Sequence, residues 1–475
     1  MKKLLLFFVT FTSVFVLSAC LTGGTGRDTV TDVNIPDELP TEQVNLIFWH
    51  AWGETNSNLV AEMFESFKAE YPELNVNLTQ TGQGNYDSLR ESLIHAIAAG
   101  ATPTMMIGYP DHFAGYLNGN AIVPLDDFIS HPEWGVDLDD FIEGYIEENS
   151  QFPDYIFSLP LSKSTEMAVY NKDVFDAHGY DFSNLTHALT WDDLEAMMED
   201  IVAPSGMSDA DRATNMQTRY MINIDSSSNF YINSSRQWGA GYTDTDGNIL
   251  IDEDEGRTRE MLEFFQARFA DRTIVFPIEE GLDYGNELLH RGLVAITQGS
   301  TAGMQYNIPT ASRTSNGIFG MFDIGVMPVI QKDSCELGAD ATDVPGTCSA
   351  MQQGPNIAIS SDASDAERLV AWLFIKHMTN TENTAMFAMT TGYIPVRYSA
   401  FQSDDYQTFL DDMEDPFAMA ARAAQAQINF YRFDAAFTGE VTSARARNEV
   451  GQALDALFTG DGVDTVINRL KSRLS

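Results

Sequence analysis

Hydrophobic and polar positions alternate along the chain with two different periods. The segment 44–49 is a short apolar run that predicts a β-strand, whereas segment 58–73 has apolar residues at i, i+3 and i+4, which predicts an amphipathic helix. A strand at 74–80, a helix at 85–100 and a strand at 104–108 are expected to follow. This order predicts a parallel α/β sheet with right-handed connections.

The alternation of strands and helices resumes after residue 160. Strands are expected at 166–171, 293–297, 322–327 and 356–360, and helices at 190–202, 257–270 and 365–379. From about Phe417 the chain is expected to be helical. No period of 20 to 50 residues repeats, which excludes a solenoid. The pattern predicts two α/β lobes, in which ligands bind at the carboxyl ends of parallel strands.

Large ring side chains follow the first expected strand directly. Trp49 is expected to pack within the strand, and His50, Trp52 and Glu54 are expected to lie on the loop at its carboxyl end. Burial in the core is the alternative for His50 and Trp52.

The first residues have the pattern of an export signal. Two lysines precede an uncharged run at 4–17, which is followed by Leu-Ser-Ala-Cys ending at Cys20. The run is too short to cross a hydrocarbon core of about 30 Å as a helix. The last four residues resemble the lipobox of bacterial lipoproteins. We therefore expect a signal peptide at 1–19 and, at 20–43, a lipidated Cys20 with a flexible tether; an ordinary signal peptide with a chance cysteine is the alternative.

The chain is strongly acidic. Its 27 Lys and Arg residues against 69 Asp and Glu residues give a net charge of −42, which makes nucleic acid an unsuitable partner because phosphate backbones are repelled. Solubility at a cell surface and a saline habitat both explain such a charge. An anionic ligand would need a local cluster of donors, since the overall field opposes it.

Two cysteines, Cys335 and Cys348, lie close together in a polar insert. In an exported chain this spacing predicts a disulfide that closes a surface loop, and a metal site would need more soft ligands than two. The segment 244–253 has acidic residues at calcium-loop offsets, but Tyr242 occupies the first ligand position. A hairpin with an Asp-Gly turn is the favoured interpretation of this segment.

Eight stretches of the chain occur in the order in which one protein family has them. They are "IFWHAWGE", "FESFKAEYPELNV", "LIHAIAAGATPTMMIG", "LPLSKSTEMAVYNKDVF", "TWDDLEAM", "GLVAITQGSTAG", "GPNIAIS" and "TTGYIPVR". From Val44 onward the chain resembles the extracellular solute-binding proteins of ABC importers, of the type that binds carbohydrates and sn-glycerol 3-phosphate. The resemblance implies an α/β, two-lobed, periplasmic-binding-protein-like fold of type II, with a ligand cleft between the lobes and several hinge crossings.

The resemblance also implies where the lobes begin and end. Crossings are expected at 159–164, near Gly354 and near Pro395, so that the N-terminal lobe is 44–158 plus 354–395 and the C-terminal lobe is 159–353 plus 396–475. Such hinges close around a ligand by small backbone changes in a few residues.

Ligand contacts follow from the resemblance position by position. It places Tyr86, Ser164, Ser300, Gly354, Tyr393 and Arg447 at ligand-contacting positions. Arg447 would hold a phosphate, with Ser300 as a further donor. The chain departs from the glycerol-3-phosphate-binding members in three places: Pro110 replaces a glutamate, Asn229 or Phe230 would have to replace a stacking tryptophan, and Gln353 precedes Gly354 where two glycines are expected. A sugar, a polyol or another glycerophospho-compound therefore stays open as the ligand.

The residue types alone suggest a related set, because sugar-type ligands need aromatic faces and polar groups for their hydroxyls. Candidates for aromatic faces are Trp52, Tyr86, Phe230, Trp238 and Tyr393, and candidates for hydroxyl partners are Glu54, Asp87, Asp111, Asn229 and Gln353. Arg447 or Lys163 would hold an anion. Arg445 and Arg447 lie roughly 200° apart on a helix, so at most one of them is expected to face a cleft.

These observations predict a lipid-anchored receptor of an ABC importer on the extracellular face of the cell membrane. It would deliver a sugar or glycerophosphate to the permease transmembrane subunits, as a monomer and without a cofactor or metal. Zinc-helix, nucleophile-elbow and phosphate-loop motifs are absent from the sequence. A glycoside hydrolase needs only two carboxylates and stays an alternative, as does a surface adhesin.

Overall fold

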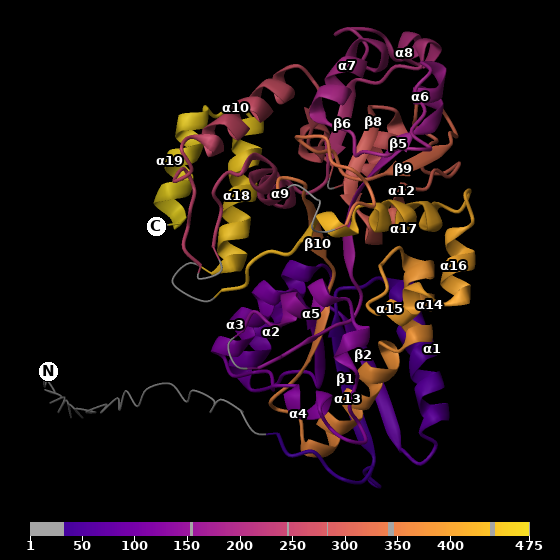
Figure 1. Ribbon diagram of the computed structural model, residues 1–475, viewed down its shortest axis with the longest axis vertical. Helices are drawn as coiled ribbons and strands as arrows, with labels where there is room; N and C mark the ends of the chain where they lie inside the picture. Colours follow the sequence, from indigo (N-terminus) through magenta and orange to yellow (C-terminus); the bar gives the residue numbers. More distant parts are fainter. Residues whose placement is uncertain are drawn as a thin grey trace, which may run out of the picture.

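The computed structural model describes residues 33–152, 155–244, 247–282, 284–340, 346–437 and 442–474. Their strands form two separate sheets, one in each of two lobes that lie one above the other in Figure 1. The expected signal peptide, Cys20 and the tether up to residue 32 lie outside the described residues. Within the described ranges no helix has the length and apolar character needed to span a membrane.

The first lobe, which is the lower one in Figure 1, contains a five-stranded sheet of order β2-β1-β3-β11-β4. Its strands are β1 (Val44–His50), β2 (Val76–Gly82), β3 (Met105–Gly108), β4 (Leu159–Pro160) and β11 (Asn356–Ile359). β1 is parallel to β2 and β3, as expected. β11 is antiparallel to both β3 and β4, because the chain enters it from the other lobe.

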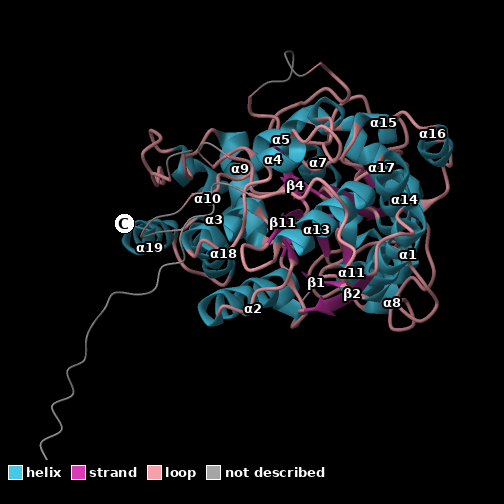
Figure 2. Cartoon of the chain, turned by 90° about the horizontal axis from the view of Figure 1, so that it is seen from below, coloured by secondary structure: helices cyan, strands magenta, loops and turns pink. Residues whose placement is uncertain are grey.

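Helices surround the first sheet, as the view in Figure 2 shows. They are α1 (Glu54–Glu70), α2 (Tyr86–Ala99), α3 (Pro110–Asn118), α4 (Asp126–Ile129), α5 (Glu143–Asn149), α13 (Asp365–Met378) and α14 (Thr381–Thr391). α13 buries every residue from Leu369 to Ile375, so it is a central helix of the lobe and not an amphipathic surface helix. The core around it includes Phe48, Ile107 and Phe128.

The second lobe contains a seven-stranded sheet whose strands run in the order β12-β10-β5-β8-β6-β7, with β9 also paired to β5. The strands are β5 (Ser164–Asn171), β6 (Tyr220–Ile224), β7 (Ile274–Val275), β8 (Val294–Ser300), β9 (Ile324–Met327), β10 (Ala350–Gln353) and β12 (Tyr431–Arg432). β5 is antiparallel to β8, β9 and β10, whereas β6 is parallel to β7 and β8. The sheet is therefore mixed.

The remaining α-helices of the described residues are mostly short. They are α6 (Lys172–Ala177), α7 (Trp191–Ile201), α8 (Asp209–Asn215), α9 (Ser227–Trp238), α10 (Arg257–Ala270), α11 (Asn286–Arg291), α12 (Met304–Asn307), α15 (Tyr398–Phe401), α16 (Asp404–Leu410), α17 (Pro416–Ala426), α18 (Ser443–Phe458) and α19 (Val463–Leu474). The expectation of helix throughout from Phe417 is wrong in one place, because β12 interrupts it to pair with β10.

Three connections join the lobes. The chain passes from β4 to β5, returns from β10 to β11, and passes again between α14, which packs on α1, and α17, which packs on β5. Gly354, in the second connection, has a φ of +95°, and a Cβ there would lie 2.3 Å from the carbonyl oxygen of Ser162. Only glycine fits this close approach without strain. The architecture confirms the expected two-lobed fold with several crossings, whereas the lobe boundaries stay a prediction.

Candidate functional site

A cleft of about 740 Å³ lies between the lobes. The first lobe contributes the beginning of α2, the beginning of α3 and the end of α5. The second lobe contributes the beginning of α9, strand β10, the segment around Asp434 and the first turns of α18. The lining residues are Tyr86, Asp87, Arg90, Glu91, Tyr109, Pro110, Asp111, His112, Glu148, Ser226, Ser228, Asn229, Met351, Gln352, Gln353, Asp434, Thr442, Ala444, Arg445, Arg447 and Asn448.

Helix caps hold the cleft residues in place at three helix starts. The Asn85 side chain accepts a hydrogen bond from the Ser88 N–H at the start of α2, which positions Tyr86 and Asp87 in the first turn. The Ser226 side chain caps α9 by accepting from the Asn229 N–H, and the Thr442 side chain caps α18. The cleft is thus built largely from first turns of helices.

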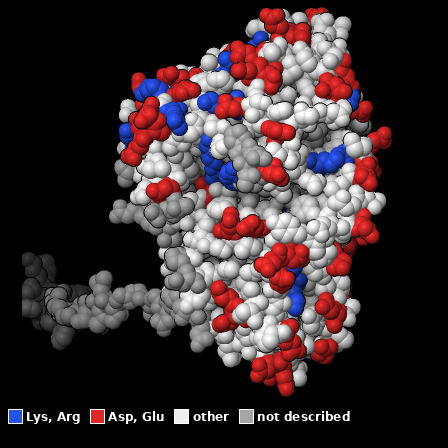
Figure 3. Space-filling model, viewed as in Figure 1, with Lys and Arg blue, Asp and Glu red and all other residues white. Residues whose placement is uncertain are grey.

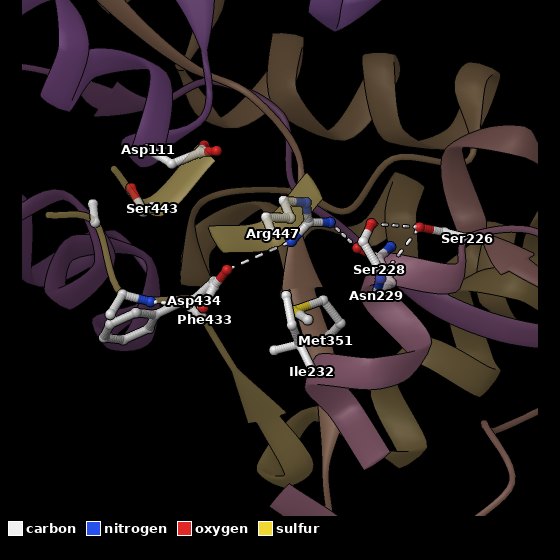
Figure 4. A network of polar contacts seen from close by, with 12 residues as sticks. Asp111, Ser226, Ser228, Asn229, Ile232, Met351, Phe433, Asp434, Ser443 and Arg447 are labelled. Atoms are coloured by element: carbon white, nitrogen blue, oxygen red, sulfur yellow. Dashed lines mark hydrogen bonds and ion pairs between the residues drawn. The ribbon is translucent and has the colours of Figure 1, made fainter. Parts of the chain in front are cut away.

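Arg447 is the central cation of the cleft (Figure 4). Its guanidinium donates a hydrogen bond to Asn229 Oδ1, and Nη1 lies 3.6 Å from Asp434 Oδ2. Burial opposes the charged form, but the carboxylates of Asp434 and Asp111 outweigh burial and raise the pKa of Arg447 above its ordinary value. Burial in turn raises the pKa of Asp434, against the opposing effects of Arg447 and Arg236. Arg447 therefore stays charged beside one close carboxylate.

Asn229 connects Arg447 to a buried carboxylate. Its Nδ2 donates to Glu166 Oε1 at 2.8 Å while its Oδ1 accepts from Arg447, so both ends of the amide are engaged. Glu166 is 2% exposed on β5, and burial raises its pKa, although hydrogen bonds from Asn229 and Gln298 and the charge of Arg447 act against this. The hydrogen bond to Glu166, on the side away from the cleft, thereby fixes the orientation of the Asn229 amide.

Tyrosine rings form the opposite wall, in the first lobe. The ring centroids of Tyr86 and Tyr109 lie 4.6 Å apart. The hydroxyl of Tyr86 lies 3.4 Å from that of Tyr393, which accepts a hydrogen bond of 3.2 Å from Trp52 Nε1. Burial raises the pKa of both Tyr86 and Tyr109, so their hydroxyls are protonated and can donate. This wall offers aromatic faces and hydroxyl groups to a solute.

Comparison with known proteins gives a consistent result. The family model for bacterial extracellular solute-binding proteins matches residues 62–416. This chain belongs to that family. The sn-glycerol-3-phosphate-binding periplasmic protein UgpB of Shigella dysenteriae is 24% identical to it over 369 residues, which cover 77% of this chain and 77% of that protein. The match confirms the family predicted from the ordered sequence stretches.

Solved structures of similar fold cover nearly the whole chain. The structure of UgpB from Mycobacterium tuberculosis in complex with glycerophosphocholine has a TM-score of 0.69 at 20% identity, covering 91% of this chain and 97% of that one. The cyclic alpha-maltosyl-1,6-maltose binding protein from Arthrobacter globiformis has a TM-score of 0.65 at 14% identity, covering 91% and 98%. At these identities the likeness shows the fold, and the fold is that of a two-lobed solute-binding protein.

Six of the residues predicted to contact ligand line the cleft of this solute-binding protein: Tyr86, Asp87, Asp111, Asn229, Gln353 and Arg447. Asp111 and Asp87 are in the first turns of α3 and α2, both in the first lobe. Asn229 and Arg447 come from the second lobe, so the predicted set spans the cleft. Arg445 lines the cleft as well, contrary to the expectation that only one of these arginines would, and its guanidinium donates to the Arg473 carbonyl.

Three predicted aromatic contacts are buried in the hydrophobic cores and do not line the cleft. Trp52 is 7% exposed and packs against Phe48 and Phe387 in the first lobe, as in the alternative interpretation. Phe230 and Trp238 both pack against Phe265 in the second lobe. Their large apolar surfaces gain more from removal from water than from a partly polar cleft. His50 is buried too, and burial lowers its pKa.

The remaining predicted contacts also lie outside the cleft lining. Ser164 is buried and pairs with Gln353 in the sheet, and Ser300 caps a short 3₁₀ turn through the Ala302 N–H. Gly354 belongs to a lobe connection, and Tyr393 lies behind Tyr86. Lys163, considered as an anion partner, is fully buried and already paired with Glu148.

Sequence reasoning missed several cleft residues. Arg90, Glu148 and Asp434 line the cleft, but each stands in a stretch whose spacing resembles an ordinary solvated surface. Asp434 follows the short strand β12, which the helical expectation for this region had hidden. Glu148 lies in the last turn of α5 and is recognisable only by its ion pair with Lys163.

Two further predictions concern the insert and the hairpin. Cys335 and Cys348 form a disulfide with an S–S distance of 1.98 Å, which closes the polar insert. Thr243 and Ile249 form an antiparallel bridge, as in the hairpin interpretation of that segment. Across the described part of the chain, no group of three or more His, Cys, Asp or Glu side chains could hold a metal ion.

Proposed function

We propose that this protein is the substrate-binding receptor of an ABC importer, which captures a carbohydrate or glycerophosphate-like solute in the inter-lobe cleft and delivers it to the permease transmembrane subunits. The observation that carries this proposal is the position of Arg447, whose guanidinium is held in the cleft between Asn229 and Asp434. The ligands named for the similar proteins, glycerol 3-phosphate, glycerophosphocholine and a maltose-type oligosaccharide, agree with such a site.

The cleft has the chemistry that a polyhydroxyl solute requires. Tyr86 and Tyr109 offer faces for C–H surfaces, Asp87 and Asp111 offer acceptors for hydroxyl groups, and Arg447 offers a charge for a phosphate. Because these residues come from both lobes, a solute that touches both sets stabilises the closed arrangement by its differential contacts. We infer lobes of 44–158 plus 354–395 and of 159–353 plus 396–475.

The site of action that we propose is the extracellular face of the cell membrane. A signal peptide at 1–19 and a lipid on Cys20, followed by the tether to residue 43, would keep the receptor close to its permease as a monomer. The motif at Cys20 supports this proposal and lies outside the described residues. Incorporation of radiolabelled palmitate, and its loss in Cys20→Ser, measures the anchor directly.

A thermal-shift screen tests the function. The exported chain carrying Cys20→Ser is heated with sn-glycerol 3-phosphate, glycerophosphocholine, maltose and mannobiose. A ligand that binds the folded state raises the melting temperature, because at a concentration of 100 times Kd it adds about 2.7 kcal/mol to the free energy of unfolding. We expect a shift with at least one of them. A shift with glycerophosphates that Arg447→Ala abolishes supports the phosphate site, whereas a shift with neutral sugars alone discards it.

The same screen addresses the glycosidase alternative. Several carboxylates line the cleft, and a hydrolase needs two of them in the correct positions. A receptor returns its oligosaccharide unchanged, so chromatography of the sugar after overnight incubation shows one species. Appearance of shorter sugars would show that the protein is a glycoside hydrolase and not a receptor. Absence of both a thermal shift and a product would contradict the receptor proposal and the hydrolase alternative.

A further inference from the structure

Arg90 is an unusual cation in this protein. It is on α2 and lines the cleft, where its side chain is half-buried. Every other arginine of the described ranges has a hydrogen bond or ion pair with a protein group, for example Arg445 with a carbonyl of α19 and Arg447 with Asn229. Arg90 alone among the described arginines has none. Its guanidinium N–H groups are therefore available to a ligand.

The lack of a partner is informative because the chain is so acidic. With 69 Asp and Glu residues against 27 Lys and Arg residues, carboxylates outnumber cations more than twofold. Asp87, Glu91 and Asp111 even line the same cleft as Arg90, yet none of them forms an ion pair with it. The fold thus keeps one guanidinium open in the cleft where pairing would have been easy.

Arg90 and Arg447 approach the cleft from opposite lobes, and His112 connects their positions. His112, at the start of α3, has a pKa lowered mainly by burial, and both Arg90 and Arg447 lower it further while Asp111 and Asp87 act in the opposite direction. Arg90, His112 and Arg447 all line the same cleft, so both guanidinium groups act on the same imidazole.

Arg447 alone is a weak site for an anion. Asp434 already lies beside it, and Asp111 raises its pKa from the other lobe, so the charge around Arg447 is balanced before a ligand arrives. An incoming anion would meet repulsion from these carboxylates unless a second cation compensated for it.

We propose that Arg90 is a second anion-binding residue, which together with Arg447 clamps one anionic group of the solute between the lobes. This inference rests on the proposed receptor function and specifies its ligand as a polyhydroxyl compound with a phosphate or a carboxylate. Guanidinium groups bind either anion through paired N–H donors. Because the two arginines belong to different lobes, the bridged anion favours closure in addition to adding affinity.

The test compares Arg90→Gln with Lys376→Gln in calorimetric titrations of the exported full chain. Lys376 is on α13 and outside the cleft, and its ammonium has no hydrogen-bond or ion-pair partner in the described residues, so the control removes the same charge. The probes are sn-glycerol 3-phosphate, galacturonate and maltose, which separate a phosphate, a carboxylate and a neutral polyol. Arg90→Lys keeps the positive charge but lacks the planar guanidinium with its paired N–H donors.

We expect Arg90→Gln to weaken binding of the phosphate or carboxylate probe about tenfold or more, as for loss of a charged hydrogen-bond partner. The affinity of Lys376→Gln should equal that of the unmodified chain, and the affinity of Arg90→Lys should lie between those of Arg90→Gln and the unmodified chain. The slope of log Kd against log salt should also become shallower in Arg90→Gln. Equal affinity of Arg90→Gln and the unmodified chain for the anionic probe would overturn the clamp and leave the receptor intact. Binding of maltose without either anionic probe would also overturn the clamp and leave the receptor function intact. Binding of none of the three probes would contradict both the clamp and the receptor function.

Discussion

The Lys163 ammonium donates a hydrogen bond of 3.0 Å to the carbonyl oxygen of Gly354 and thereby joins two of the connections between the lobes. The same ammonium pairs with Glu148, which lines the cleft, and lies 3.2 Å from Asn356 Oδ1. The backbone of Lys163 exchanges hydrogen bonds with Ile394, which precedes the third passage between the lobes. One fully buried residue thus contacts the hinge segments and a wall of the cleft.

Loss of the Lys163 ammonium should destabilise the protein strongly. Lys163→Met leaves the Glu148 carboxylate buried without its charge partner, which costs about 3–5 kcal/mol in comparable pairs. Urea unfolding followed by circular dichroism measures the change. Lys172→Met, which breaks the exposed pair with Asp176, should change stability by less than about 1 kcal/mol. Similar effects of the two variants would contradict a central role for Lys163, and adding Glu148→Gln to Lys163→Met should restore part of the loss.

A side chain at residue 354 should be poorly tolerated. In Gly354→Ala the new Cβ meets the carbonyl oxygen of Ser162 at 2.3 Å in a left-handed backbone, so we expect a loss of more than about 2 kcal/mol. Gly115→Ala, at an exposed position of α3 with open space around the glycine, should instead be neutral or stabilising by up to about 1 kcal/mol. Melting temperatures of both variants check this, and a neutral Gly354→Ala would mean that the hinge tolerates a different backbone.

Trp52 should matter for stability and not for ligand specificity. Trp52→Ala removes a ring that packs against Phe48 and Phe387, so we expect a loss of about 3–5 kcal/mol in the free energy of unfolding. At a temperature where the variant is folded, its affinity for a bound solute should change much less than that of Tyr86→Ala, whose ring lines the cleft. Calorimetry on both variants decides, and a larger affinity loss in Trp52→Ala would return Trp52 to the binding site.

Glu166 should make stability depend on pH. Its folded pKa lies above the ordinary value of 4.5, mainly through burial, so the folded state holds a proton that the unfolded state has already released. The contribution of Glu166 is therefore favourable below about pH 4.5 and is lost as the pH rises through the folded pKa. Glu166→Gln cannot ionise, and its melting temperature should fall less between pH 5 and pH 8 than that of the unmodified chain. Glu65→Gln, at an exposed position, should follow the unmodified chain; parallel curves for Glu166→Gln would contradict the assignment.

Local pattern sufficed for most of the elements. The expected helix at 257–270 is α10, and the expected helix at 85–100 is α2 with Gly100 in the left-handed conformation just beyond its end. These features depend on residues close in sequence: apolar spacing, caps and turn glycines. The disulfide between Cys335 and Cys348 also depends on residues close in sequence, since only thirteen positions separate the two cysteines. The order of the family stretches also pointed to the two-lobed fold.

The composition of the cleft was decided by tertiary structure alone. Asn229 and Arg447 are 218 positions apart, and Trp52 and Tyr393 are 341 apart, so no local pattern shows that the first pair faces the cleft and the second lies behind it. An aromatic ring after a strand has the same sequence signal whether it stacks on a solute or fills a core. Its environment depends on which distant segments pack against it, and in this chain three passages between the lobes determine those neighbours.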